Sequence, residues 1–189
     1  HSGMHFPRLI DSSCLLSYSI ALLCEQVHEP VAPLGQGKAG TSQEAIARIG
    51  HYVLEPPSDG DSETDFLVSS RPQSRSLLII CSDFLQDPDI LSAQLSALGT
   101  AVNGAIFIQI LDPAEITLPY VGNVVFEGRE EHIRVERVED VRERYLRRID
   151  NHNAIIQKIC ADYEGHYIFH RTDAPYAQTL LTIWEALKR

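Results

Sequence analysis

A run of apolar residues that ends in an acidic turn constrains the fold of this chain more than any other stretch. Residues 77–81 read Leu-Leu-Ile-Ile-Cys, and the turn that follows carries Ser82, Asp83, Asp87 and Asp89. A run this short and this rich in isoleucine predicts a strand that is buried on both faces of a parallel sheet. Ligands of open α/β sheets bind beyond the carboxyl ends of the strands, so Asp83 is predicted to lie at a functional edge.

A second apolar run predicts a neighbouring parallel strand. Residues 104–111 read Gly-Ala-Ile-Phe-Ile-Gln-Ile-Leu, and residues 88–98, between Asp87 and Gly99, have the pattern of an amphipathic helix. A strand, a helix and a strand in this order predict a parallel crossover. Asp112 and Glu115 follow the second strand and are therefore predicted to lie at the carboxyl edge of the sheet.

The remaining periodicities predict four further helices, a hairpin and a last strand. Helices are expected over residues 9–27, from the capping box at Thr41 to Pro56, over residues 138–163, and after Pro175 with Ala177, Leu180, Leu181, Trp184 and Leu187 inward. Residues 121–127 and 132–137 predict an antiparallel hairpin appended to the sheet, and residues 167–170 predict the last strand. A length of 189 residues fits one domain that spans residues 1–189.

Composition argues against two classes of partner. The formal net charge is −10 and the sequence pI is near 5.2, whereas contacts with nucleic-acid phosphates need an excess of Lys and Arg. The most apolar helical stretch, residues 9–27, contains Asp11 and Glu25, and its longest unbroken apolar run is residues 20–24, so no membrane span is expected. The four cysteines lie in apolar segments and lack the spacing of metal ligands; they are Cys14, Cys24, Cys81 and Cys160. This pattern predicts that they are core residues and that the protein resides in the reducing cytoplasm.

Familiar catalytic and metal motifs are missing or weak. Residues 35–41 have the residue types of a phosphate-binding loop in the wrong order, and no Gly-x-Ser-x-Gly elbow occurs. His166 and His170 fall on a predicted strand, where they could lie on one face as a metal pair or as part of a polar sheet end. His152 lies on the apolar stripe of its helix and predicts a hydrogen-bonded core histidine.

Asp83 itself has two interpretations that the residues leave open. A carboxylate with a hydroxyl beside it at a strand end suits Mg²⁺, which takes oxygen ligands. Alternatively, Asp83 caps the following turn and Asp87 caps the following helix.

Four segments together carry a family resemblance. They are residues 76–88 (SLLIICSDFLQDP), residues 108–119 with their Leu-Asp-Pro-Ala-Glu and Leu-Pro sequences, Tyr145, and residues 172–175 (Thr-Asp-Ala-Pro). In this order, over residues 76–189, they resemble the domain-of-unknown-function family fifty-eight. The resemblance implies a von Willebrand factor A-like fold, which is a Rossmann-like, doubly wound α/β domain with a mostly parallel sheet flanked by helices. It also implies an association with MoxR-type AAA+ ATPases, beside which members of the family are commonly encoded.

The resemblance further implies a metal-ion-dependent adhesion site, which this chain matches only in part. Such a site combines an Asp-x-Ser-x-Ser motif, a Thr and an Asp. Asp83 matches the Asp, and Thr64 matches the Thr, with Thr41 as the alternative. Residues 1–3, His-Ser-Gly, stand where the first motif is expected and lack its Asp. The expectation is an incomplete site with no cofactor or with weakly bound Mg²⁺.

Three functions from different classes follow. The first is a non-enzymatic protein-interaction module that presents Ser82, Asp83, Asp112 and Glu115 to a protein partner, with a MoxR-type AAA+ ATPase as the partner suggested by family analogy. The alternative is a Mg²⁺-dependent phosphohydrolase that uses Asp83 and Asp112 at adjacent strand ends. The third is a structural role in oligomerisation.

Overall fold

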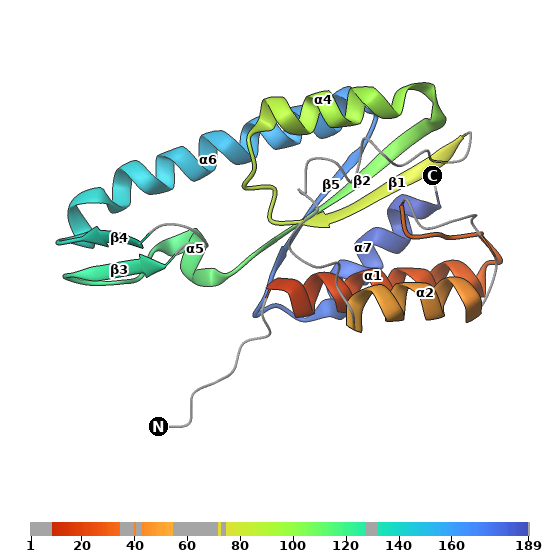
Figure 1. Cartoon of the computed structure of the whole chain (residues 1–189), viewed down its shortest axis with the longest axis horizontal. Helices are drawn as coiled ribbons and strands as arrows, with labels where there is room; N and C mark the ends of the chain where they lie inside the picture. Colours follow the sequence, from red (N-terminus) through yellow and green to blue (C-terminus); the bar gives the residue numbers. More distant parts are fainter. Residues whose placement is uncertain are drawn as a thin grey trace.

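The described part of the chain is built in three layers, with a parallel sheet between two groups of helices (Figure 1). The computed structural model describes residues 9–34, 40, 43–54, 72, 75–127 and 132–188. In chain order the elements are α1 (Leu9–Gln26), α2 (Gln43–Leu54), β1 (Ser76–Ser82), α4 (Pro88–Leu98), the 3₁₀ helix η1 (Gly99–Ala101), β2 (Val102–Leu111), α5 (Pro113–Thr117), β3 (Val124–Glu127), β4 (His132–Val135), α6 (Val138–Asp162), β5 (His166–Arg171) and α7 (Tyr176–Leu187). The mixed α/β class, with helices on both faces of a parallel sheet, is confirmed.

The sheet has the order β1-β2-β5, and both pairings are parallel. Ser82 of β1 is level with Gln109 of β2, and Leu111 of β2 is level with Arg171 of β5. The predicted parallel pairing of the two apolar runs is therefore confirmed, and the carboxyl ends of all three strands meet at one edge.

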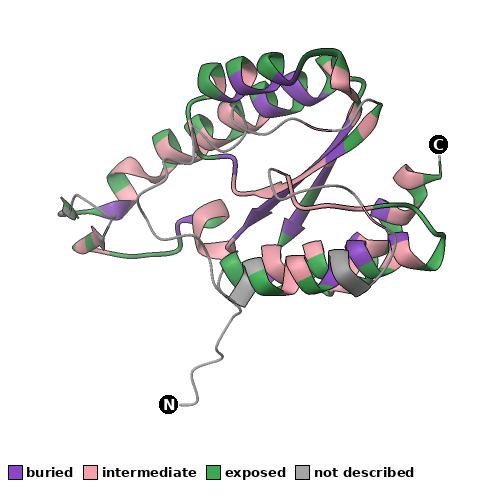
Figure 2. Ribbon diagram, turned by 45° about the vertical axis from the view of Figure 1, so that its right-hand side comes forward, coloured by how far each residue is buried: buried purple, intermediate pink, exposed green. Residues whose placement is uncertain are grey.

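The centre of the sheet is β2, and β1 is only partly buried, which corrects the expectation that the first apolar run is a strand buried on both faces. Residues 105–111 of β2 are all buried, whereas in β1 only Leu78 is buried and Leu77 is 47% exposed. Both faces of β1 contact helical cores, but no strand lies beyond it in the described parts of the chain. A strand with a neighbour on one side only keeps more of its surface in solvent, and Figure 2 shows burial concentrated on the middle of the sheet.

Two apolar cores separate the sheet from its helices. The core beneath α4 and α6 contains Leu78, Phe84, Leu91, Leu95, Leu98, Ala105, Phe107, Ile156, Ile159 and Cys160. The core beneath α1 and α7 contains Leu16, Ile20, Cys24, Ile106, Ile108, Ile110, Ile168 and Ile183. The alternation of residues 105–110 between the two cores is the two-residue period of a strand that is covered on both faces. All four cysteines are free; Cys24 and Cys160 are buried as predicted, whereas Cys14 and Cys81, which were also predicted to be core residues, are partly exposed.

Local sequence sets the ends of α4 as expected. The carboxylate of Asp87 accepts a hydrogen bond from the backbone amide of Asp89 at 2.9 Å, Pro88 occupies the first turn, and Gly99 ends the helix with a φ of 57°.

In the described residues, no helix is both long and apolar enough to cross a membrane.

The predicted antiparallel hairpin forms as β3 and β4, in a two-stranded sheet of its own. It lies at the amino-terminal end of α6, away from the main sheet (Figure 1). Two side chains of α6 hold the segment that leads into it: the guanidinium of Arg142 donates to the carbonyl oxygens of Leu118 and Tyr120, and Glu139 accepts from the amide of Gly122 at 2.9 Å. The hairpin is therefore attached through α6.

Candidate functional site

Polar residues gather where the three parallel strands end. Ser82 and Asp83 close β1, Asp112 follows β2, and Thr172 follows β5. The backbone amide of Thr172 donates to the carbonyl oxygen of Leu111 at 3.1 Å, which ties the ends of β2 and β5 together. This is the carboxyl edge that the sequence predicted as the functional edge.

The Asp83 side chain caps its own turn. Its Oδ1 accepts from the amide of Leu85 at 3.1 Å and lies 3.5 Å from the hydroxyl of Ser82. The Ser82 hydroxyl in turn accepts from the amide of Phe84 at 3.1 Å. The capping interpretation of Asp83 is thus observed, while its Oδ2 accepts no hydrogen bond from any residue that the structure describes. With respect to the described residues, one carboxylate oxygen is therefore available to a ligand or a partner.

The turn itself depends on a buried phenylalanine. Phe84 has a left-handed φ of 54°, is 1% exposed, and stacks on Phe107 with the ring centroids 5.0 Å apart. The Phe84 carbonyl oxygen lies 2.6 Å from Nε2 of His152, so this histidine is hydrogen-bonded as predicted, but it is half-buried beside the core and not inside it. Because the oxygen can only accept, the ring carries a proton on Nε2.

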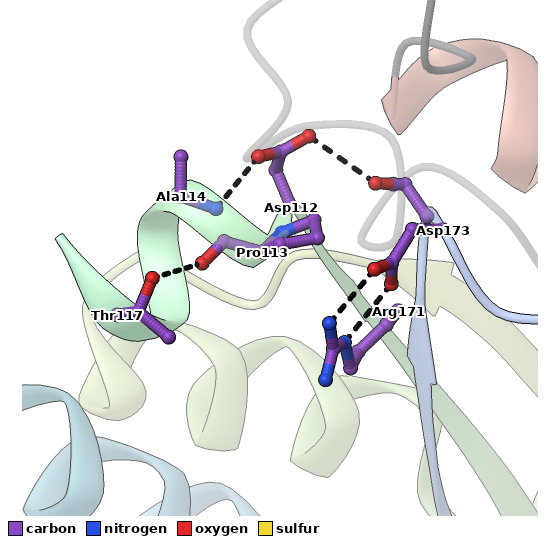
Figure 3. A network of polar contacts seen from close by, with 7 residues as sticks. Asp112, Pro113, Ala114, Thr117, Arg171 and Asp173 are labelled. Carbon is purple, nitrogen blue, oxygen red and sulfur yellow. Dashed lines mark hydrogen bonds and ion pairs between the residues drawn. The ribbon is translucent and has the colours of Figure 1, made fainter. Parts of the chain in front are cut away.

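Asp112 is the amino-terminal cap of the short helix α5 (Figure 3). Its Oδ1 accepts from the amide of Ala114 at 2.8 Å, and its Oδ2 accepts from the hydroxyl of Thr172 at 3.2 Å. Glu115 completes a capping box, because its Oε2 accepts from the amide of Asp112 at 2.8 Å. Beside them, Arg171 and Asp173 form a two-pronged ion pair at 2.8 and 2.9 Å.

The charges of two edge carboxylates act on the third, that of Glu115. Partial burial raises the pKa of Glu115, the hydrogen bond from the Asp112 backbone lowers it, and the nearby charges of Asp83 and Asp112 raise it further, with a net upward shift. Three carboxylates from the ends of β1 and β2 thus share one acidic region.

The structure brings four of the predicted site residues to one edge: Ser82, Asp83, Asp112 and Glu115. Thr64 and its alternative Thr41, like residues 1–3, lie outside the described residues. Within the described ranges, no group of three or more His, Cys, Asp or Glu side chains could hold a metal ion. Asp83 offers one carboxylate oxygen, while Ser82 and Asp112 already accept hydrogen bonds, so a cation here would need ligands from elsewhere. The metal role of Asp83 and Thr64 stays a prediction.

The two histidines on β5 have different surroundings. His170 is 1% exposed and its Nδ1 lies 2.8 Å from the hydroxyl of Thr179, whereas His166 is half-buried. The ring of His170 also faces Tyr176 at a centroid distance of 4.9 Å. His170 is therefore part of the contact between β5 and α7.

Sequence reasoning missed the residue that lies beneath the Asp83 turn. Gln109 is fully buried on β2; its Nε2 donates to the carbonyl oxygen of Asp83 at 2.8 Å and to Oδ1 of Asn153 at 3.0 Å. Its Oε1 accepts from the hydroxyl of Tyr167. The available signal was a single amide side chain inside an otherwise apolar strand, because such a group must find partners when it is buried.

Comparison with known proteins identifies the family. A family model described as "Protein of unknown function DUF58" matches residues 19–155, which is well over half of the chain. The match includes the apolar run of β1, the end of β2 and Tyr145, and it stops before residues 172–175. Neither the curated proteins nor the solved structures gave a significant match. The chain therefore belongs to the family of proteins of unknown function DUF58.

Proposed function

We propose that this protein is a non-enzymatic interaction module whose carboxyl sheet edge, made of Ser82, Asp83, Asp112 and Glu115, binds a protein partner. The observation that carries the proposal is the state of Asp83: one carboxylate oxygen is fixed by the amide of Leu85, and the other accepts no hydrogen bond within the described residues and lies near two further acids. A carboxylate that is already held in place loses little conformational entropy when a partner binds it. Such an edge suits recognition by Lys, Arg or backbone amides.

By analogy with the family, the partner is a MoxR-type AAA+ ATPase. The four cysteines are free, as expected in the reducing cytoplasm, where such an ATPase would bind this protein. Mg²⁺ enters the proposal as a weakly held ion at Asp83 and Thr64, because affinity for the ion follows the number and charge of its oxygen ligands.

The test is a titration with a purified MoxR-type ATPase from the same genome, in excess Mg²⁺ and again with EDTA. Asp83→Asn keeps an acceptor for the Leu85 amide and removes the charge, so the turn is retained. We expect binding to weaken about tenfold, which is the scale of one charge-assisted hydrogen bond at an interface. Asp150→Asn, an exposed acid on α6, removes the same charge away from the edge and should bind as the wild type does. Equal affinity of all three proteins would reject the Asp83 edge as the binding surface.

The phosphohydrolase alternative needs both Asp83 and Asp112 to hold a metal ion. Both oxygens of Asp112 already accept hydrogen bonds, from Ala114 and Thr172, which favours a structural role for this carboxylate. A screen of phosphoesters with Mg²⁺ and Mn²⁺ addresses the alternative directly. Turnover that disappears in Asp83→Asn would replace the interaction proposal with an enzymatic one.

A further inference from the structure

A polar side chain lies where the central strand of the sheet is otherwise apolar. Gln109 is 0% exposed, as are Ile106, Phe107, Ile108 and Ile110 around it. Burying an amide costs free energy unless its donors and acceptor are satisfied. Here the amide reaches three other parts of the fold: the Asp83 carbonyl after β1, Asn153 of α6 and Tyr167 of β5.

The carbonyl of Phe84, the next residue of the turn, is held by a side chain of α6. His152, adjacent to Asn153 on α6, donates from Nε2 to the Phe84 carbonyl oxygen at 2.6 Å. Two successive carbonyls, those of Asp83 and Phe84, are thus fixed from beneath the surface. This matters because the left-handed conformation of Phe84 is unfavourable for a residue with a side chain by roughly 1 kcal/mol or more.

The same helix also reaches the second acid of the edge. The hydroxyl of Tyr145 donates to the carbonyl oxygen of Glu115 at 3.0 Å. Three side chains of α6 therefore hold groups next to the edge acids. Tyr145 bonds the carbonyl of Glu115, His152 bonds the carbonyl that follows Asp83, and Asn153 bonds the buried amide of Gln109. These contacts hold the main chain of the edge residues, in addition to the hydrogen bonds that the edge carboxylates themselves accept.

We propose that Gln109, together with His152 and Asn153, is a positioning device that sets the geometry of the Asp83 turn for partner binding. The inference rests on the proposed function of the edge for its effect on binding, whereas its effect on the turn can be measured without a partner. A loss of the Gln109 amide should free the Asp83 carbonyl, let Phe84 leave its left-handed conformation, and weaken the bond from the Leu85 amide to Asp83.

The experiment is amide hydrogen exchange on the whole chain, with residue-resolved NMR detection. Gln109→Met keeps the length of the side chain and removes its polar atoms. The amides of β2 report how much the substitution changes global stability. Relative to the wild type, we expect exchange of the Leu85 amide to speed up about tenfold more than this global change explains. Thr179→Val is the matched control, because it removes a buried hydrogen bond, to His170 at 2.8 Å, on the opposite face of the sheet. In Thr179→Val, the exchange rates of the Leu85 amide and of the β2 amides should rise by amounts that the change in global stability explains.

A second pair of variants keeps the inference testable if Gln109→Met folds poorly. His152→Leu removes the donor to Phe84, whereas His152→Gln retains an N–H donor on a side chain of similar reach. The Leu variant should speed local exchange at residues 84–85, and the Gln variant should restore protection. Loss of protection in proportion to global stability in all variants would overturn the positioning role.

Partner binding separates this inference from the proposed function. If Gln109→Met loosens the turn and weakens binding as Asp83→Asn does, both stand. If it loosens the turn while neither variant affects binding, the positioning role stands and the proposed function fails. If Asp83→Asn loses binding but Gln109→Met leaves Leu85 exchange and affinity unchanged, the edge function stands and the positioning role is wrong.

Discussion

The hydroxyl of Thr172 donates a hydrogen bond of 3.2 Å to the carboxylate of Asp112, a residue 60 positions earlier in the chain. The contact joins the end of β5 to the end of β2 at the level where α5 begins. Asp112 thereby stabilises the fold in two ways, as a helix cap and as an acceptor between strands. A substitution at Asp112 would alter the fold as well as the edge, so Thr172 is the better position at which to measure this bond.

Thr172→Val should lower the free energy of unfolding by about 1 to 2 kcal/mol, because Thr172 is buried and its loss leaves a carboxylate oxygen without this donor. Thr117→Val is the control, since its hydroxyl makes an exposed bond of 2.9 Å within α5, to the carbonyl of Pro113. Its effect should stay within about 0.5 kcal/mol. Urea denaturation of both variants checks the prediction, and equal losses would contradict it.

Glu115 should make stability fall as the pH rises above the ordinary value of 4.5 for its carboxyl. Burial, the largest cause, raises its pKa in the folded protein, so the folded state holds the proton more tightly than the unfolded state does. The contribution of Glu115 to the free energy of unfolding is therefore complete below pH 4.5. It is lost as the pH rises through the pKa of Glu115 in the folded protein. Glu115→Gln keeps an oxygen acceptor for the Asp112 amide and does not titrate.

The difference in unfolding free energy between Glu115→Gln and the wild type should therefore grow in favour of the variant from acid to neutral pH. Urea titrations at a series of pH values measure this difference, in which the titrating groups that do not interact with Glu115 cancel. A difference that is constant with pH would show that burial and the charges of Asp83 and Asp112 do not act on Glu115 as argued.

His170 should have the opposite kind of effect, on the acid side of its ordinary pKa of 6.5. Burial lowers the pKa of His170, with the charge of Asp173 acting against the shift, so the folded protein favours the neutral ring. The contribution to stability is present above 6.5 and is lost as the pH falls below it, because the unfolded chain then takes up the proton more readily. In the described residues, Nε2 of His170 has no hydrogen-bond partner that could share this proton.

His170→Phe fills a similar space beside Tyr176 and cannot titrate. The stability of the wild type relative to this variant should decline as the pH is lowered from 7 to 5, a range that brackets the ordinary pKa of histidine at roughly 6.5. Thermal or urea unfolding across that range measures the decline. Parallel pH profiles for the two proteins would contradict the prediction.

Gly165 should not tolerate a side chain, and the reason is crowding. A Cβ at this position would lie 2.7 Å from the carbonyl oxygen and the sulfur of Cys160 and 2.8 Å from the carbonyl oxygen of Ala105. The left-handed residue at the end of α6 is Glu164, with a φ of 52°, so the usual role of a glycine after a helix is filled by its neighbour. Gly165→Ala should cost about 1 to 3 kcal/mol of stability through overpacking.

Gly50→Ala is the matched control for this substitution. Among the described residues, nothing lies within 4 Å of a Cβ at Gly50, which is inside α2. A glycine inside a helix costs about 1 kcal/mol relative to alanine, so this variant should be more stable than the wild type. Opposite signs for the two glycine substitutions are the expected outcome of thermal denaturation.

The last helix shows where periodicity alone is insufficient. Its sequence predicted an inward face with Ala177 and Leu181, yet Leu181 is 64% exposed and the buried residues are Thr179 and Ile183. Apolar residues occur on more than one side of α7, so several faces satisfy a helical period. The face that becomes buried is the one that meets α1 and β5, where Thr179 can bond His170 and Tyr176 can bond Ser12 at 3.0 Å.

The sequence by itself determined most of the elements and several of their ends, although not the short helices η1 and α5, because these features depend on atoms only a few residues apart. The cap by Asp87, the stop at Gly99, the two apolar strands and the long amphipathic helix all follow from neighbouring side chains. Only the tertiary structure decided that β2 is central and β1 lies at the edge of the described sheet, and that Gln109 lies behind Asp83. Burial and hydrogen bonding at these positions depend on residues such as Asn153 and Tyr167, which lie more than forty positions away in the sequence.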